Sequence, residues 1–471
     1  MAGRAGLCFS ALRREGGSEG SDEGEGQPTG WCRFEEPKDG KGGSFTVKVR
    51  KITWAVTTLL VVGILVLAAS PVAAQRKSLE IWHIFTNEHE AAVIERAVER
   101  FRADYPDVDV TITVTDNDTY KTKLQVAMAA GTPPDVFNSW GGGWLEAYVD
   151  AGMVLPLTEA LAKDGWGDIY VPASLELAKF GDDYYAVPLT LAVVVFFYNQ
   201  QLFDQYGWEP PETWSELLDL VADMRSKGII PISLANRTKW PGAFYFIYLA
   251  HRVGGHEVFL NAYNRVPGYG FDHEAFVRAG ELIQELVRAG AFPPGFNGLD
   301  HDVGQASALM YSGRAAMHLM GSWFPGQARA EDPEFGQHVG WFPFPRIEGS
   351  SADPTEVVAG GDLFSVASTT KHPEEALALL RYITDEQTAA DWTRATGRLP
   401  AVIGTPIDDP MTADLMAYLE NAGYMQLYYD QFLPPELGEL HKDTTQAIFG
   451  GTMTPLEAAR AMEAKAKELL D

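Results

Sequence analysis

The chain has 471 residues, which is too long for one compact core and indicates two lobes or domains. Its net charge of -27 argues against nucleic acids and anionic membrane surfaces as partners. The two cysteines, Cys8 and Cys32, both precede residue 75, so the remaining chain can form no disulfide, thiolate nucleophile or cysteine metal site. A chain without cysteine after this point fits export.

The N-terminal segment has the pattern of an export leader. Residues 1–46 are rich in Gly, Ser and Glu, which predicts disorder or an incorrectly assigned start of translation. A basic segment and the apolar stretch Ile52–Ala69 follow, and small residues precede Gln75. We therefore expect a secretory signal peptide over residues 47–74 and an exported protein, periplasmic or at the cell surface. The alternative is a membrane anchor, because 18 apolar residues can just span a bilayer.

From residue 78 the apolar pattern predicts alternating strands and helices. Strands are expected at Ser78–Ile84, Val108–Val114 and Asp135–Phe137, and helices at Glu88–Tyr105 and Tyr120–Ala130. This order predicts a parallel sheet flanked by helices.

The stretch Phe180–Asn199 stands at the centre of the chain. Its first residues include Gly181 and two aspartates, which predict a short hairpin. Leu189–Asn199 is a nearly continuous run of apolar, β-branched and aromatic residues, typical of a strand buried on both faces. Thr213 is a favourable N-cap for an amphipathic helix that begins at Trp214.

The same patterns predict the elements that follow. We expect helices at 214–227, 240–252, 271–289, 304–312, 373–383 and 455–470, strands at 229–233, 340–345 and within 313–323, and loops at 296–301 and around 428–431.

Several motifs carry a family resemblance. They are Gly131–Val136 (Gly-Thr-Pro-Pro-Asp-Val), Gly181–Pro188, Tyr198–Phe203, Pro210–Trp214 and Gly313–Trp323 (Gly-Arg-Ala-Ala-Met, then Gly-Ser-Trp). Their order resembles the family 1 extracellular solute-binding proteins of ABC importers, the group that includes maltose-binding protein. The resemblance covers nearly all of 78–470. Each motif is a loose pattern, and Gln200 and Arg314 stand where the family often has Lys.

The resemblance implies the fold. It is an α/β, two-lobed periplasmic-binding-protein fold, type II-like, and each lobe is a mixed, mainly parallel sheet flanked by helices. The chain would cross between the lobes near Leu191–Val193, at Ala359–Val366 and at Arg398–Pro400. Lobe 1 would then contain 75–190 plus 364–400, and lobe 2 would contain 191–363 plus 401–471. A buried strand of an unrelated α/β enzyme is the alternative for the central stretch taken alone.

Tryptophan, Asn and Gly residues gather in the loops at the expected carboxyl ends of strands, where ligands bind in open α/β sheets. A sugar suits this composition, because its ring face stacks on an aromatic side chain and its hydroxyls need paired donors and acceptors. The resemblance makes Trp323 the foremost stacking platform. The other candidates are Trp140, Trp144, Trp240, His83, Asn87, Glu88, Asn138, Asn236, Gly361, Asp362, Arg398, Tyr428, Tyr429 and Gln431.

Some candidates have a structural alternative. Of Trp140 and Trp144, one is expected to pack in the core, and His83 is a candidate only if its neighbour Trp82 is the packed residue. Asp362 follows Gly360 and Gly361, where the backbone can flex or approach another group closely.

The predicted function is that of the extracytoplasmic binding component of an ABC transporter. It would bind a mono- or oligosaccharide by hinge closure, as a monomer, and deliver it to the permease. No metal or organic cofactor is indicated, and His256 and His301 have no partner at metal-ligand spacing. The rivals are a binder of a glycerol phosphoester or a polyamine, and a secreted glycoside hydrolase. Adjacent Asp182 and Asp183 give the latter little support, because glycosidase carboxylates must face each other across a gap.

Overall fold

The computed structural model describes residues 76–471, and the predicted leader and signal peptide, 1–46 and 47–74, lie outside the described residues. The first half-sheet has the predicted β-α-β-α-β order, formed by β1 (Lys77–His83), α2 (Glu88–Asp104), β2 (Val108–Val114), α3 (Asn117–Ala129) and β3 (Val136–Ser139). β1 lies between β2 and β3 and is parallel to both. The predicted parallel arrangement is therefore present in this part of the sheet.

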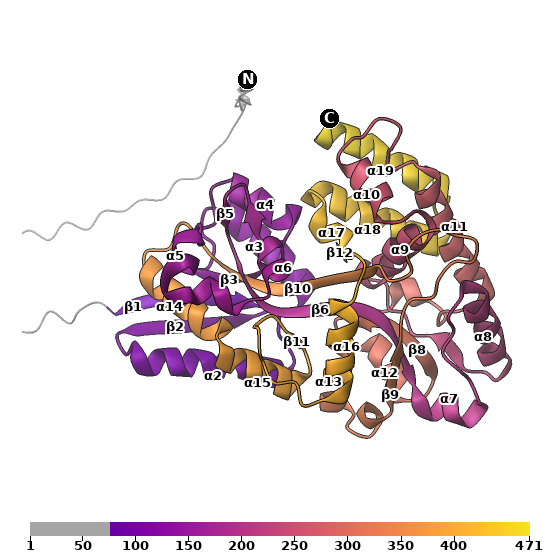
Figure 1. Cartoon of the computed structure of the whole chain (residues 1–471), viewed down its shortest axis with the longest axis horizontal. Coiled ribbons are helices and arrows are strands. Elements are labelled where there is room, and N and C mark those ends of the chain that lie inside the picture. Colours follow the sequence, from indigo (N-terminus) through magenta and orange to yellow (C-terminus); the bar gives the residue numbers. More distant parts are fainter. Residues whose placement is uncertain (1–75) are drawn as a thin grey trace, which may run out of the picture. The chain divides into compact units, whose positions relative to one another are not determined.

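Three strands connect the two halves of the molecule. The first part of β6 (Val187–Asn199) pairs with β10 (Val357–Val366) and β11 (Leu399–Pro400), and its second part pairs with β8 (Ala315–Gly321) and β9 (Val339–Phe342). The other end of β10 pairs with β3. Figure 1 shows β6 and β10 passing side by side between the two groups of helices. Strands β6, β10 and β11 are the three predicted crossings.

The crossing strands join both halves into one hydrogen-bonded path of strands, in the order β2-β1-β3-β10-β6-β8-β7. The outer pair β7 (Ile230–Ile232) and β8 is parallel, as is the pair of β10 with β12 (Met425–Leu427). The pairs that involve β6 are antiparallel. The sheet is thus mixed, because β6 runs antiparallel to its neighbours and β10 runs antiparallel to β3 and β6, whereas β10–β12, β7–β8 and the strands of the first half-sheet pair in parallel.

The helices cover both halves of the sheet. Their bounds are α4 (Gly143–Asp150), α5 (Thr158–Ala162), α6 (Pro172–Glu176), α7 (Gln200–Tyr206), α8 (Trp214–Ser226), α9 (Trp240–Gly254), α10 (His256–Tyr263), α11 (Glu274–Ala289), α12 (Gln305–Tyr311), α13 (Phe324–Glu331), α14 (Pro373–Thr384), α15 (Glu386–Thr396), α16 (Pro410–Glu420), α17 (Tyr429–Phe432), α18 (Pro435–Gly450) and α19 (Pro455–Leu470). The predicted hairpin consists of β4 (Lys179–Phe180) and β5 (Asp183–Tyr184). In the part of the chain described here, no helix has the length and apolar character needed to cross a bilayer.

The buried apolar side chains form separate clusters. One contains the second half of β6, with helices α8, α9, α11 and α18 around it, and two others contain β1, α2, α3 and the first half of β6. The core therefore changes partway along β6, where this strand leaves one half of the molecule for the other. The lobe boundaries given above, at 190/191, 363/364 and 400/401, stay predictions.

One predicted loop is a helix. The segment around 428–431 contains α17, a helix of four residues. A helix this short is not visible as a periodic pattern, so its polar and aromatic residues were expected in a loop. By contrast, α8 begins at Trp214, as the Thr213 N-cap predicts, and Thr213 and Glu216 form a capping box. The Thr213 hydroxyl accepts from the Glu216 backbone N–H, and the Glu216 carboxylate accepts from the Thr213 backbone N–H.

Candidate functional site

A cleft of about 570 Å³ lies between the two halves of the molecule, within the size range of ligand pockets. One side comes from the loop after β1, the loop before α3 and Trp140, and the other from α9, the 301–304 segment, α13 and α17. The crossing strands contribute Gly361, Asp362 and Arg398 to its lining. A ligand in this cleft would touch both halves and the crossing strands at once.

A buried ionic network lies at the crossing strands. Arg398 donates through Nη1 to Asp362 Oδ2 at 2.9 Å and through Nε to Glu90 Oε1 at 2.7 Å. The indole Nε1 of Trp140 donates to the other oxygen of Asp362 at 3.1 Å. Strand β10, helix α2 and the segment after α15 are tied together through this network.

Burial and ion pairing act in opposite directions on this network. Burial raises the pKa of Asp362 above its usual value, although Arg398 acts to lower it. Burial alone would lower the pKa of Arg398, but Glu90 and Asp362 hold it above its ordinary value. The guanidinium therefore stays charged and orients both carboxylates at the wall of the cleft.

Two indole rings line the opposite side. Trp323 follows β8 and is the N-cap of α13, and Trp240 is the first residue of α9. Their ring centroids are 6.3 Å apart. A Cβ on Gly321 would lie 2.0 Å from the Trp323 ring, so the glycine of the Gly-Ser-Trp motif leaves the space that the indole occupies. The guanidinium of Arg398 lies 5.8 Å from the centre of the Trp323 ring.

The segment that contains α17 brings Tyr428 and Gln431 to the cleft. A Cβ on Gly360 would lie 2.7 Å from the Tyr428 ring, so this glycine makes room for the tyrosine. Among the described residues, the Tyr428 hydroxyl, the Gln431 Oε1 and the Trp240 Nε1 have no hydrogen-bond partner. Donors and acceptors of a polar ligand could pair these groups.

Acidic groups meet where the two sides approach each other. Burial raises the pKa of Asp302 to about 6, and the negative charges of Asp118 and Asp116 on the opposite side add to this effect. Nearby, the Lys121 ammonium lies 3.3 Å from Asp430 Oδ2 and forms an ion pair that joins α3 to α17. Burial alone would raise the pKa of Asp430, but Lys121 and Lys442 hold it below its usual value.

The structure brings nine of the fifteen candidates to the cleft: Asn87, Trp140, Trp240, Trp323, Gly361, Asp362, Arg398, Tyr428 and Gln431. The roles of these residues in binding stay predictions.

Two aromatic candidates lie elsewhere. Trp144 is buried behind Trp140, with ring centroids 5.0 Å apart and an edge-to-face orientation. Both indoles are buried in the same core cluster, and of the two only Trp140 also lines the cleft. Tyr429 is buried with its ring stacked on Phe259 at 3.8 Å, because α17 turns it away from the cleft.

Two of the polar candidates outside the cleft, Asn236 and Asn138, form hydrogen bonds with the backbone instead. The Asn236 Oδ1 accepts from the backbone of Gly242 at 3.1 Å, inside the first turn of α9. Asn138 is fully buried and donates to the backbone of Leu363 at 3.0 Å. Glu88 is exposed in the first turn of α2, where Glu90 reaches the cleft instead.

His83 is also outside the residues that line the cleft. Both His83 and its neighbour Trp82 are buried, so packing of the tryptophan does not turn the histidine toward the cleft. The His83 Nδ1 accepts from the backbone N–H of Phe85 at 3.2 Å, and burial lowers the pKa of His83 to about 4.

Several lining residues were not named as candidates from the sequence, namely Glu90, Asp116, Asn117, Lys121, Phe244, His301, Asp302, Tyr311, Gln327, Glu331 and Asp430. Asp116 and Asn117 follow β2, so the rule about carboxyl ends of strands would have found them. Glu90 follows the capping residue Asn87 by three positions, which places both on one side of the first helical turn. Asp302 comes from a loop that no motif marks.

Known proteins share the sequence pattern and the architecture of this chain. The family described as bacterial extracellular solute-binding protein matches residues 86–390. A solved structure described under xylan utilization by the thermophilic bacterium Caldanaerobius polysaccharolyticus is 32% identical, with a TM-score of 0.78, and the match covers 82% of this chain and 99% of that one.

Two sequence relatives agree with this match. An uncharacterised ABC transporter extracellular-binding protein of Pyrococcus horikoshii is 26% identical over 75% of this chain and 79% of its own length. A multiple sugar-binding protein of Streptococcus mutans is 25% identical over 67% of this chain and 74% of its own length. Since the family match spans more than half of the chain, and its two-lobed fold and cleft agree with it, the protein belongs to the bacterial extracellular solute-binding proteins.

Proposed function

We propose that this protein is the extracytoplasmic binding component of an ABC importer and that it binds an oligosaccharide in the cleft between its lobes. The observation that carries the proposal is the pairing of two half-buried indole rings, Trp323 and Trp240, with the charged Arg398–Asp362 pair across one cleft. Indole faces suit the C–H face of a sugar ring, and charged groups suit its hydroxyls.

Binding is coupled to closure of the lobes. A ligand that touches both sides and the crossing strands favours the closed arrangement to the extent that it binds that arrangement better than the open one. The permease then recognises the closed, loaded protein. The exported location follows from the family and from the predicted signal peptide, and we expect the protein to act as a monomer.

The relatives indicate which saccharides to test first. The 32% identical structure comes from work on xylan utilization, and another structural neighbour, 24% identical with a TM-score of 0.77, is a chitin oligosaccharide binding protein. Xylo-oligosaccharides are therefore the first class to test, followed by chito-oligosaccharides.

The non-sugar rivals find less support in the cleft. A phosphoester needs cationic groups that are free to bind it, but Arg398 is engaged by two carboxylates and Lys121 is paired with Asp430. A polyamine needs carboxylates that are free to bind it, but Glu90 is paired with Arg398 and Asp430 with Lys121, which leaves Asp302 and Glu331 among the acidic lining residues. It remains the alternative to be tested beside the sugars.

A thermal-unfolding screen of the purified protein tests the proposal. Xylo-, chito- and malto-oligosaccharides, monosaccharides, polyamines and glycerol phosphoesters are added in turn. A saccharide present at a hundred times its Kd should stabilise the protein by about 2.7 kcal/mol. In Trp323→Ala the shift should largely disappear, because the indole contributes its stacking surface to the ligand.

Trp208→Ala is the matched control. This indole is also half-buried in the second half of the chain, but it stacks on Tyr206 and donates to Asp223, away from the cleft. Its loss should leave the saccharide shift unchanged. A shift from amines or phosphoesters alone would overturn the sugar class, and release of product from a chromogenic glycoside would favour the hydrolase.

A further inference from the structure

A cluster of histidine and glutamate side chains lies outside the cleft, at the junction of α9 and α10. Gly255 has a φ of 75° and reverses the chain between the two helices, so that His256 and Glu257 are the first two residues of α10. Glu356 reaches the same place from a distant part of the sequence, as the residue directly before the crossing strand β10. The sequence separation of 100 between His256 and Glu356 explains why the sequence showed no partner for this histidine.

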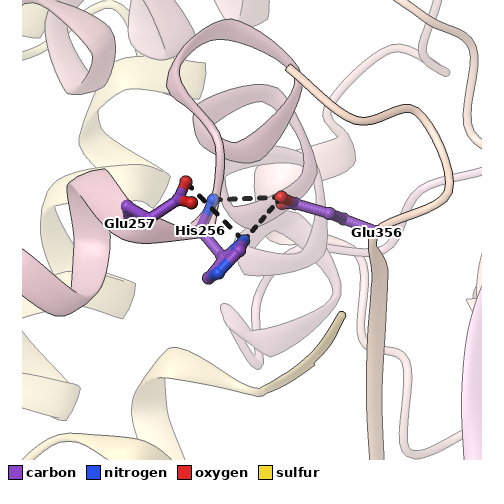
Figure 2. A group of neighbouring side chains, drawn as sticks. All are labelled: His256, Glu257 and Glu356. Atoms are coloured by element: carbon purple, nitrogen blue, oxygen red, sulfur yellow. Dashed lines mark hydrogen bonds and ion pairs between the residues drawn. The ribbon is translucent and has the colours of Figure 1, made fainter. Parts of the chain in front are cut away.

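The potential ligand atoms converge on one point. The His256 Nδ1 lies 2.7 Å from Glu356 Oε1 and 3.8 Å from Glu257 Oε2. The ligand atoms of these three residues all lie within 4.8 Å of one another. Figure 2 shows His256 between the two carboxylates. The imidazole nitrogen and carboxylate oxygens are ligand types that zinc takes, and three such protein ligands would leave a fourth position open.

The surroundings fix two of the three side chains. The other oxygen of Glu356 lies 2.7 Å from the Nδ1 of His251, which is buried in the last turn of α9. The His256 ring stacks on Tyr424, with centroids 3.9 Å apart. Such outer contacts orient metal ligands and increase affinity.

The cluster is also open to solvent on one side. The Glu356 side chain is 4% exposed, whereas His256 is 26% exposed and Glu257 is 68% exposed. An ion can therefore enter from the side of Glu257, which is free to turn toward it.

We propose that His256, Glu257 and Glu356 bind one Zn²⁺, with His251 as the residue that positions the Glu356 carboxylate. Zn²⁺ accepts nitrogen and oxygen ligands together, whereas Mg²⁺ prefers oxygen and retains its waters. The His256 Nδ1 offers its lone pair to the ion and the ring proton is on Nε2, so the contact between Nδ1 and Glu356 becomes two bonds to the metal. The site joins the α9–α10 junction to the start of β10 and is independent of the carbohydrate cleft.

Calorimetric titration of the purified protein, after treatment with a chelator and its removal, tests this site. ZnCl₂ should bind in one equivalent, and MgCl₂ at the same concentration should give no such binding. Glu257→Gln should weaken zinc binding by about tenfold or more, and His256→Gln should abolish it. Since Glu257 is exposed, its substitution should leave the fold intact, and circular dichroism checks this.

The control is Glu274→Gln. His273 and Glu274 form the same His-Glu pair at the start of α11, but in the described part of the chain no further carboxylate completes a cluster there. This variant should bind zinc like the unmodified protein. Absence of stoichiometric binding would overturn the proposal, and so would binding that persists unchanged in both His256→Gln and Glu257→Gln.

Discussion

Asp302 is the cleft residue whose protonation is expected to make the free energy of unfolding depend on pH. Its pKa of about 6 in the folded protein, against 3.8 in an ordinary aspartate, means that the ionised carboxylate is disfavoured by burial and by Asp118 and Asp116. This penalty is fully present above pH 6 and disappears as the pH falls through 6 toward 3.8. Asp302→Asn should therefore raise the free energy of unfolding at pH 7.5 by on the order of 1–2 kcal/mol, after allowance for solvent screening, and should give no gain at pH 3.5.

Urea unfolding at the two pH values measures this effect. Asp219→Asn on the exposed side of α8 is the control, and it should change the unfolding free energy little at either pH. An equal gain from Asp302→Asn at both pH values would show that packing, and not charge, is responsible.

At the residue scale, the sequence predicts the chemical type of the site better than the direction of each side chain. Trp323 and Trp240 were expected at strand-end loops and lie in the cleft, because the positions of such loops follow from the order of strands and helices. Asn236 and Asn138 have equally suitable amides, but backbone groups of Gly242 and Leu363 use them. The sequence does not show which side-chain amides will form hydrogen bonds with the backbone, so it could not show which of the asparagines reach the cleft.

At the scale of single elements, the close contact between the crossing strands β10 and β6 predicts how a substitution there changes stability. A Cβ on Gly361 would lie 2.2 Å from the backbone oxygen of Thr190, on the neighbouring strand β6. Gly361→Ala must therefore push the crossing strands apart and should lower the free energy of unfolding by about 2 kcal/mol or more. Thermal unfolding measures this loss.

Gly298→Ala is the matched control, because no atom lies within 4 Å of the added Cβ and its φ is not in the left-handed region. Its stability should change by no more than about 0.5 kcal/mol. If Gly361→Ala were equally silent, β10 would have room to move away from β6, and the close contact would not constrain the hinge.

The elements themselves differ in how well the sequence predicts them. β6 was expected from its apolar run, and the structure buries nearly every residue of it, because it lies inside the sheet between layers of helices. α19 was expected over its whole length from its composition, and the structure adds a capping box formed by Thr454 and Glu457 at its start. α17, with four residues between Tyr428 and Leu433, has no periodicity to detect, and its placement depends on contacts with Gly142 and the start of α4.

At the scale of the whole molecule, the two-lobed architecture was predictable because three separate crossings follow the order of a known family. The relative placement of the lobes was not, since it depends on side chains that meet only in the folded protein. The Lys121–Asp430 pair is one of these contacts, because its partners are more than three hundred residues apart.

Lys121→Met tests whether this pair supports the closed arrangement. The lysine and aspartate side chains are 17% and 8% exposed, so removal of the lysine leaves the carboxylate of Asp430 poorly compensated while the lobes stay together. Opening the cleft hydrates that carboxylate, and the open arrangement should gain population. We expect a larger radius of gyration by X-ray scattering without ligand and about tenfold weaker saccharide binding, which corresponds to about 1.4 kcal/mol.

Lys227→Met removes a lysine–aspartate pair that lies within one half of the molecule, since Lys227 and Asp223 are one helical turn apart at the end of α8. It should leave both the scattering and the saccharide Kd unchanged, because a pair on one surface contributes equally to the open and closed arrangements. A Lys121→Met protein with weaker binding and an unchanged radius of gyration would mean that Lys121 contacts the ligand directly. Unchanged values for both measurements would mean that the pair contributes no net free energy to the closed arrangement.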